Sequence, residues 1–270
     1  LFEGTPPSFY SLRVAPQLVG LGLLEAVDES TIAGFADPCD TISADGISGR
    51  MSMTRGLVAG QPLVGRFNWK GGAASLEDQI AYAFNRDMGV ASARLSTLDG
   101  ETVPSAPEVT SAEINSMARY IGLLGVNARR DVAGTSIGEG LFQQASCTKC
   151  HIPTMDTGMT HPWSEVRGQT IHPYTDMLLH DMGAGLADSM SLNGQNATSS
   201  EWRTPPLWGI GLAADVYDDN GREGYLHDGR ASSLEEAILW HGGEASGAKD
   251  YFRNMSAADR SELIKFLKSL

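Results

Sequence analysis

The sequence is short of cysteine, of basic residues and of long apolar runs, and each shortage argues against a class of protein. Three cysteines among 270 residues are too few for a disulfide framework. Twenty Lys and Arg against 33 Asp and Glu give a net charge of −13, which argues against nucleic acid as a partner. The longest apolar candidate, LVGLGLLEAV at 18–27, carries Glu25 and is shorter than the roughly 18–20 residues that span a bilayer. We therefore expect no membrane span.

The remaining composition is that of a globular protein, with 41% hydrophobic and 20% charged residues. The length suits one large or two ordinary domains. The sequence begins at Leu1 rather than Met and shows no apolar signal-peptide region. We expect a chain that is processed, truncated or only partly represented.

Two of the three cysteines stand in CTKCH, residues 147–151. The pattern C-x-x-C-H is typical of covalent haem c attachment, in which both thiols bind the haem vinyl groups. Cys147 and Cys150 are then the anchors, and His151 is the proximal iron ligand. Cys39 is left over, and we expect a small buried apolar residue there. An interchain or ligand-related role is the alternative.

Two other interpretations of the motif are weaker. A structural zinc site needs a second Cys or His pair, and the sequence has no second Cys pair and no H-x₃₋₅-H. A redox dithiol belongs between a strand and a helix, whereas the residues before Cys147 have a helical pattern. In that pattern Ser136 and Glu139 have the spacing of a capping box.

Three further helices complete a mostly α prediction. The segment 110–131 has apolar residues at helical spacing after Thr110 or Ser111, and 255–270 has them after a Ser256–Asp259 cap. The segment 234–241 follows Ser233 and stops at two glycines. Its apolar stripe ends in His241, which makes that histidine a candidate sixth ligand. The segment 152–223 lacks periodicity, and we expect loops and short helices around the haem.

An internal repeat divides the chain. FNWKGGAASLEDQIAYAF (67–84) resembles YLHDGRASSLEEAILWHG (225–242), with Trp69 at the position of His227 and Ala83 at that of His241. We expect residues 1–133 to be the later part of a domain without its own C-x-x-C-H. Residues 134–270 are expected to form a cytochrome c-like domain with one covalent haem. A first haem motif then lies on a missing segment, a cleaved one or another polypeptide.

The motifs together resemble the bacterial di-haem cytochrome c peroxidase superfamily, nearest to its di-haem oxidoreductase branch. They are SLRVAPQLVGLGLLEAV (11–27), DGISGR (45–50), SLEDQIAYAFNRDMG (75–89), CTKCH (147–151), HPYTDMLLHDMGAGLAD (172–188), EWRTPPLWGIG (201–211) and LHDGRASSLEEAILWHGGEA (226–245). The resemblance implies a peroxidatic N-terminal haem that receives electrons from a C-terminal haem.

The resemblance also implies site residues. In relatives the sixth ligand of the C-terminal haem is Met or Tyr, 14 residues after the histidine of the HDG-type element, and that position is His241 here. Met182 is the rival. Asp87 in NRDMG matches the place of a catalytic glutamate. His180 matches a position near the C-terminal haem.

Three further residues are candidate haem contacts. His227 is a structural residue or a contact to a haem propionate. Arg203 and Arg230 could pair with propionates, because Arg suits bidentate contacts to carboxylates.

Three functions stay open. The chain is the electron-transfer part of a di-haem peroxidase-like oxidoreductase, a non-catalytic electron-carrier subunit of a larger multi-haem assembly, or a haem-stabilised structural module. The first two require an electron-donor redox protein or another haem subunit as partner.

A second imidazole ligand favours ferric iron, so we expect a lower haem potential than with Met ligation. Covalent haem attachment accompanies export, which predicts a periplasmic or outer-surface location.

Overall fold

The computed structural model of the chain describes residues 11–58, 60–98, 101–102, 106–188, 197–217 and 224–270. Within these ranges helix predominates over strand, as the mostly α prediction requires. The helices are α1 (Leu21–Glu25), α2 (Glu29–Phe35), α3 (Leu76–Met88), α4 (Ser111–Gly122), α5 (Ser136–Gln144), α6 (Ala213–Tyr217), α7 (Leu234–Trp240), α8 (Ser246–Asn254) and α9 (Ala257–Ser269). None of the helices in these ranges is long and apolar enough to cross a membrane.

The strands are short and pair two by two, in antiparallel fashion. The pairs are β1 (Met53–Arg55) with β2 (Pro62–Val64), β3 (Thr97–Leu98) with β4 (Glu101–Thr102), β5 (Met155–Asp156) with β6 (Thr170–Ile171), and β7 (Leu179–Asp181) with β8 (Glu201–Arg203). Six short 3-10 turns also occur in the described residues, among them Ala133–Thr135, Cys147–Lys149 and Gly243–Ala245.

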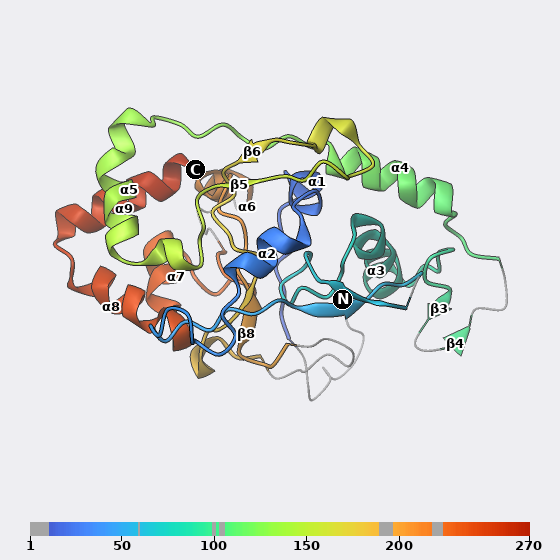
Figure 1. The fold of residues 1–270 in the computed structure, drawn as a ribbon, viewed down its shortest axis with the longest axis horizontal. Coiled ribbons are helices and arrows are strands. Elements are labelled where there is room, and N and C mark those ends of the chain that lie inside the picture. The colour runs from blue at the N-terminus through green and yellow to red at the C-terminus, as the bar shows by residue number, and fades with distance from the viewer. Residues whose placement is uncertain (1–10, 59, 99–100, 103–105, 189–196, 218–223) are drawn as a thin grey trace.

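The elements gather at two ends of the molecule (Figure 1). Helices α5, α7, α8 and α9 form the left end in that view, and α3, α4 and the β3–β4 pair form the right end. Helices α1 and α2 lie between them. The blue segment that precedes β1 runs from the middle toward α7 and α8, so the two halves of the chain interleave.

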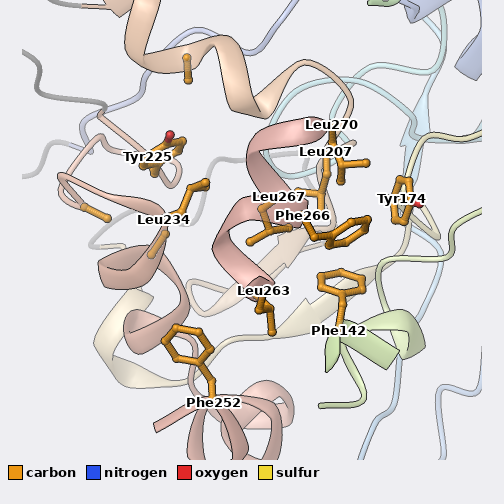
Figure 2. Close-up of a cluster of buried hydrophobic side chains, with 13 residues drawn as sticks. Phe142, Tyr174, Leu207, Tyr225, Leu234, Phe252, Leu263, Phe266, Leu267 and Leu270 are labelled. Carbon is orange, nitrogen blue, oxygen red and sulfur yellow. The ribbon is translucent and has the colours of Figure 1, made fainter. Parts of the chain in front are cut away.

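The left end has its own apolar core (Figure 2). Phe142 of α5 packs against Phe266 of α9, with ring centroids 5.4 Å apart, and both rings contact Tyr174. Leu263, Leu267 and Leu270 continue the same cluster. The backbones of α5 and α9 meet at Gly138, where an added Cβ would overlap the carbonyl oxygen of Glu262. A glycine is therefore required for this helix contact.

A central core joins the two halves. Leu24, Val27 and Ile32 from the first half pack with residues of the second half. The second-half members of this cluster are Met155, Ile171, Met177, Leu178 and Trp208. A third cluster lies between α3 and α4. Apolar side chains from both sides of the predicted division at residues 133 and 134 pack in this one cluster. The division into two domains stays a sequence-based prediction.

The internal repeat has a structural counterpart. In both copies an antiparallel bridge closes a turn with two left-handed residues, and a serine then caps the following helix. The matched positions are Phe67 with Tyr225, Asn68 with Leu226, Gly71 with Gly229, Ala73 with Ala231, and Ser75 with Ser233. The two copies thus position α3 and α7 in the same way.

Three local predictions were wrong. Ser136 does not cap α5: a 3-10 turn leads directly into the helix, and the Ser136 hydroxyl donates to the carbonyl of Ala133. Cys39 is exposed rather than buried, because it lies in the turn between Asp37 and Asp40. The helix expected over 110–131 ends at Gly122, although its Thr110–Glu113 capping box is present.

The segment 152–223 also departs from the expectation of loops and short helices. It contains β5 to β8 in addition to 3-10 turns and α6. Strands of two or three residues are too short to give an alternating pattern. Residues 189–196 and 218–223 of this segment lie outside the described ranges.

Candidate haem site

The attachment motif follows α5 through a left-handed residue. Ser146 has φ of 62°, and the chain then turns through Cys147–Lys149 so that the His151 N–H donates to the Cys147 carbonyl at 2.9 Å. The His151 Nδ1 lies 2.9 Å from the carbonyl oxygen of Tyr174. A carbonyl only accepts, so Nδ1 carries the proton and Nε2 of the neutral ring keeps its lone pair. This is the arrangement of an iron-binding imidazole.

His241 has the same arrangement on the other element. It is the first residue after α7, where the backbone leaves the helix at φ −57° and ψ 130°. Its Nδ1 lies 2.8 Å from the carbonyl oxygen of Ala237, so its Nε2 is also left with a lone pair. Two histidines in the described residues near CTKCH thus have a fixed tautomer that suits ligation.

Burial lowers the pKa values of both rings. Burial lowers the pKa of His151 to about 4; the Tyr174 carbonyl raises it, and the charge of His241 lowers it further. Burial also lowers the pKa of His241. Both rings are therefore neutral at neutral pH, which is the form that binds iron. Burial raises the pKa of Cys147 to about 12 and raises that of Cys150, so both side chains are thiols here.

The surroundings of the motif are apolar. The Phe142 ring lies 6.1 Å from the His151 ring, and Cys147, Leu226 and Ile238 pack against the same core cluster. Tyr174, whose carbonyl orients His151, has the left-handed φ of 52° that bulky residues rarely adopt. Two free thiols, two neutral imidazoles and apolar walls fit the chemistry of a covalent haem c. His151 and His241 would bind the iron, and Cys147 and Cys150 the porphyrin.

A buried ionic network lies beside Cys150. His180 is buried, with Nε2 at 2.8 Å from Asp176 Oδ2 and Nδ1 at 2.7 Å from Glu244 Oε2. Its Nδ1 is also 3.7 Å from the Cys150 sulfur. Burial lowers the pKa of His180, but hydrogen bonds to Asp176, Cys150 and Glu244 outweigh it and raise this pKa to about 12. His180 is an imidazolium that donates from both nitrogens, and Glu244 in turn binds Ser48.

The network also brings together ligand types of a second metal site. Ligand atoms of Cys150, Asp176 and His180 lie within 4.8 Å of one another. However, both nitrogens of His180 already serve carboxylates, so neither has a lone pair for a metal. With His180 protonated, the cluster is an ion-pair network.

His227 lies in an aromatic and cationic stack. Its ring is parallel to that of Trp202, with centroids 3.6 Å apart at 14°, and Trp69 meets it edge-on. Lys70 Nζ lies 3.6 Å from the Trp202 centroid and donates to three main-chain carbonyls. Burial lowers the pKa of His227 to about 4. Trp69 and Lys70 come from the first half, so the stack contributes to the contact between the halves.

The remaining predicted site residues are spread over the molecule. Arg203 is buried and donates to the carbonyls of Asn68 and Thr204. Arg230 pairs with Asp228 at 2.6 Å and lies over Trp240. Asp87 is exposed near the end of α3. The roles proposed for them stay predictions.

Met182, the rival ligand, lies beside the segment that follows His241. Its carbonyl oxygen is 2.8 Å from the position of a Cβ at Gly242. Its backbone N–H donates to the Ser200 carbonyl. The backbone of Met182 is thus fixed close to the candidate ligand.

Sequence reasoning missed Asp176, Glu244, Ser48 and Tyr174. The signals for two of them were present but weak: Glu244 follows the two glycines after His241, and Asp176 lies four residues before His180. Ser48 and Tyr174 act through a hydroxyl, a backbone N–H or a backbone carbonyl, which no residue pattern marks.

Among the comparisons with known proteins, one identifies a family for this chain. A search of curated proteins found no match. Among solved structures, one titled "Kuenenia stuttgartiensis Hydrazine Synthase Pressurized with 20 bar Xenon" matches at 15% identity and a TM-score of 0.47, covering 100% of this chain and 98% of that one. A similarity this distant carries no argument about the function of this chain. The family described as "Di-haem oxidoreductase, putative peroxidase" matches residues 9–270, and the chain therefore belongs to the di-haem oxidoreductase family.

Proposed function

We propose that the chain carries electrons through one covalent haem c bound by His151 and His241, as the electron-transfer part of a di-haem peroxidase-like oxidoreductase. The observation that carries the proposal is the matched pair of imidazoles. Each has Nδ1 on a main-chain carbonyl and Nε2 left for the iron. A bound haem supplies one-electron redox chemistry. Residues 134–270 would be its cytochrome c-like domain.

Two histidine ligands have consequences for the chemistry. If His151 and His241 both bind the iron, peroxide would have no open position on it unless one of them leaves. The residues around this haem would hold it and exclude water, and peroxide cleavage would belong to a second haem. Imidazole in place of a thioether also lowers the haem potential.

The partners follow from the same proposal. The second haem is held by a segment or chain outside this sequence, and an electron-donor redox protein or another haem subunit completes the path. A non-catalytic carrier subunit in a multi-haem assembly is the alternative. Covalent haem attachment predicts export to the periplasm or the outer cell surface.

The test is a visible and near-infrared spectrum of the haem-loaded protein and of two variants. We expect the wild type to be low-spin, without the sulfur-to-iron band of Met ligation. His241→Ala should become high-spin, whereas Met182→Ala should keep the wild-type spectrum. A wild type that is already high-spin, binds cyanide rapidly and reduces peroxide would replace electron transfer by direct chemistry at this haem.

A further inference from the structure

The segment that follows His241 is fixed by one carboxylate. Glu244 lies in the turn Gly243–Ala245, three residues after His241. Its Oε2 accepts from His180 Nδ1 at 2.7 Å and from the Ser48 N–H at 3.0 Å. Its Oε1 accepts from the Ser48 hydroxyl at 2.9 Å and from the Asp181 N–H at 3.2 Å. Four donors therefore hold the carboxylate in one place.

The donors are themselves fixed. His180 and Asp181 belong to β7, which pairs with β8, and Asp176 holds the other nitrogen of His180 at 2.8 Å. The side chains of Asp176 and His180 are 1% and 4% exposed, so these hydrogen bonds are shielded from water. Glu244 is thus anchored to a paired strand through His180 and Asp181, and to the segment before β1 through Ser48.

The backbone around Glu244 leaves little room for movement. Gly243 has φ of 53°, and a Cβ there would overlap the carbonyl oxygen of Asp181. A Cβ at Gly242 would lie 2.8 Å from the Met182 carbonyl oxygen. Residues 242–244 therefore press directly on residues 181–183. The ring of His241 is held on its other side by Ala237.

The geometry points to Glu244 as a positioning residue for His241. By anchoring residues 242–244 to His180, Asp181 and Ser48, Glu244 holds the His241 ring where its Nε2 can meet the iron. Because Ser48 belongs to the first half, that half would help to position His241. This inference rests on the proposed function, since it presupposes a haem bound by His241.

A first-half segment reaches the proximal side as well. Asp45 pairs with Lys149, inside the CTKCH turn, while Ser48 holds Glu244. Residues 45–48 thus contact both the attachment turn and the segment of the distal ligand. In Figure 1 this stretch belongs to the blue segment that runs toward α7 and α8.

The experiment measures carbon monoxide binding to the ferrous haem-loaded protein, together with the ferric spin state. Glu244→Gln keeps the shape but removes the charge that His180 requires. We expect the rate of carbon monoxide binding to rise by about 10- to 100-fold, the scale of losing an outer partner of a metal ligand. The rate rises because carbon monoxide binds only the fraction in which His241 is off the iron.

The matched control is Glu201→Gln. Glu201 also joins the halves, through Arg50 at 2.6 Å, but lies on β8 and does not touch residues 242–244. We expect its rate to stay within about twofold of wild type, below the effect of losing an outer partner. Equal rises in both variants would mean general loosening, and would overturn the positioning role.

If Glu244→Gln does not fold or does not load haem, a second variant tests the same inference. Ser48→Ala removes one hydroxyl and leaves the backbone N–H, and it should raise the rate severalfold. Wild-type rates in every folded variant would overturn the inference while the proposed function stands. A wild type that is not bis-histidine would instead overturn the proposed function, whatever Glu244 does.

Discussion

His180 shows how a single residue concentrates charge next to the attachment motif. A buried imidazolium is stable here because each ring nitrogen donates to its own carboxylate. Removing one partner would leave an uncompensated buried charge, which costs about 3–5 kcal/mol in comparable buried pairs. His180, Asp176 and Glu244 therefore act as one unit.

This unit predicts a pH dependence of stability. The pKa of His180 is 6.5 when unfolded and about 12 when folded. The folded state thus binds the extra proton, so the stabilisation is fully present below pH 6.5. It declines as the pH rises toward 12, by up to ~1.4 kcal/mol per pH unit.

The measurement is the urea midpoint of wild type and His180→Gln at pH 6.5, 8 and 9.5, since the difference isolates this residue. The stability difference should shrink with rising pH. His172→Gln is the control, because His172 is exposed and contacts Thr154. A constant difference between wild type and His180→Gln would show that His180 is not held as an imidazolium.

At the residue scale, what the sequence predicts depends on distance along the chain. Cys147, Cys150 and His151 lie within five consecutive residues, so the turn itself places them and the motif could be recognised. The network around His180 could not, since Glu244 lies 64 residues away and reaches it only through the pairing of distant segments. The sequence carried only weak signals for it, namely His180 itself, Asp176 four residues before it and the position of Glu244 after two glycines.

At the element scale, the packing of α5 on α9 depends on Gly138 and not on Gly140, two residues further along the same helix. Gly138 faces the Glu262 carbonyl and Phe266, whereas an added Cβ at Gly140 meets no atom within 4 Å. Gly138→Ala should lower the free energy of unfolding by about 1–3 kcal/mol through overpacking. Gly140→Ala should raise it by about 0.5–1 kcal/mol through its better helix propensity.

Urea unfolding of the two haem-loaded variants measures the two changes in the free energy of unfolding. Both substitutions add one methyl group to the same helix, so the opposite signs report the local packing alone. Equal effects at the two positions would mean that α5 and α9 are not in backbone contact.

Helix starts were the most predictable elements. Ser233 and Ser256 accept from the backbone N–H three residues later, and the Thr110–Glu113 box is complete, as their spacing indicates. The prediction failed at α5 because a 3-10 turn precedes it, and the Thr135 hydroxyl already donates to the Asp131 carbonyl. A cap pattern therefore predicts a helix start only where the preceding chain is extended.

At the scale of the whole molecule, the two halves should unfold together. The central core mixes residues such as Leu24 and Ile32 with Met177 and Trp208. Arg50 pairs with Glu201 across the same division. Neither half can lose its structure without exposing apolar surface of the other, and a single cooperative transition is the expected result.

Hydrogen exchange of individual amides in increasing urea shows whether the two halves unfold together. Amides of α3, at one end, and of α9, at the other, should become unprotected at the same midpoint. Midpoints that differ clearly would mean that the halves are independent domains joined by a weak interface.

The packing of α5 against α9 also bears on the order of haem attachment and folding. Helix α5 carries the attachment turn at its end, yet its packing partner begins only at Ala257. As the chain emerges from its amino end, the core against which Cys147 packs stays incomplete until α9 arrives. Docking of α9 then completes the core in which burial raises the pKa of Cys147 to about 12, and a thiol of such pKa is a poor nucleophile. We therefore expect haem attachment to be faster before α9 docks than after it.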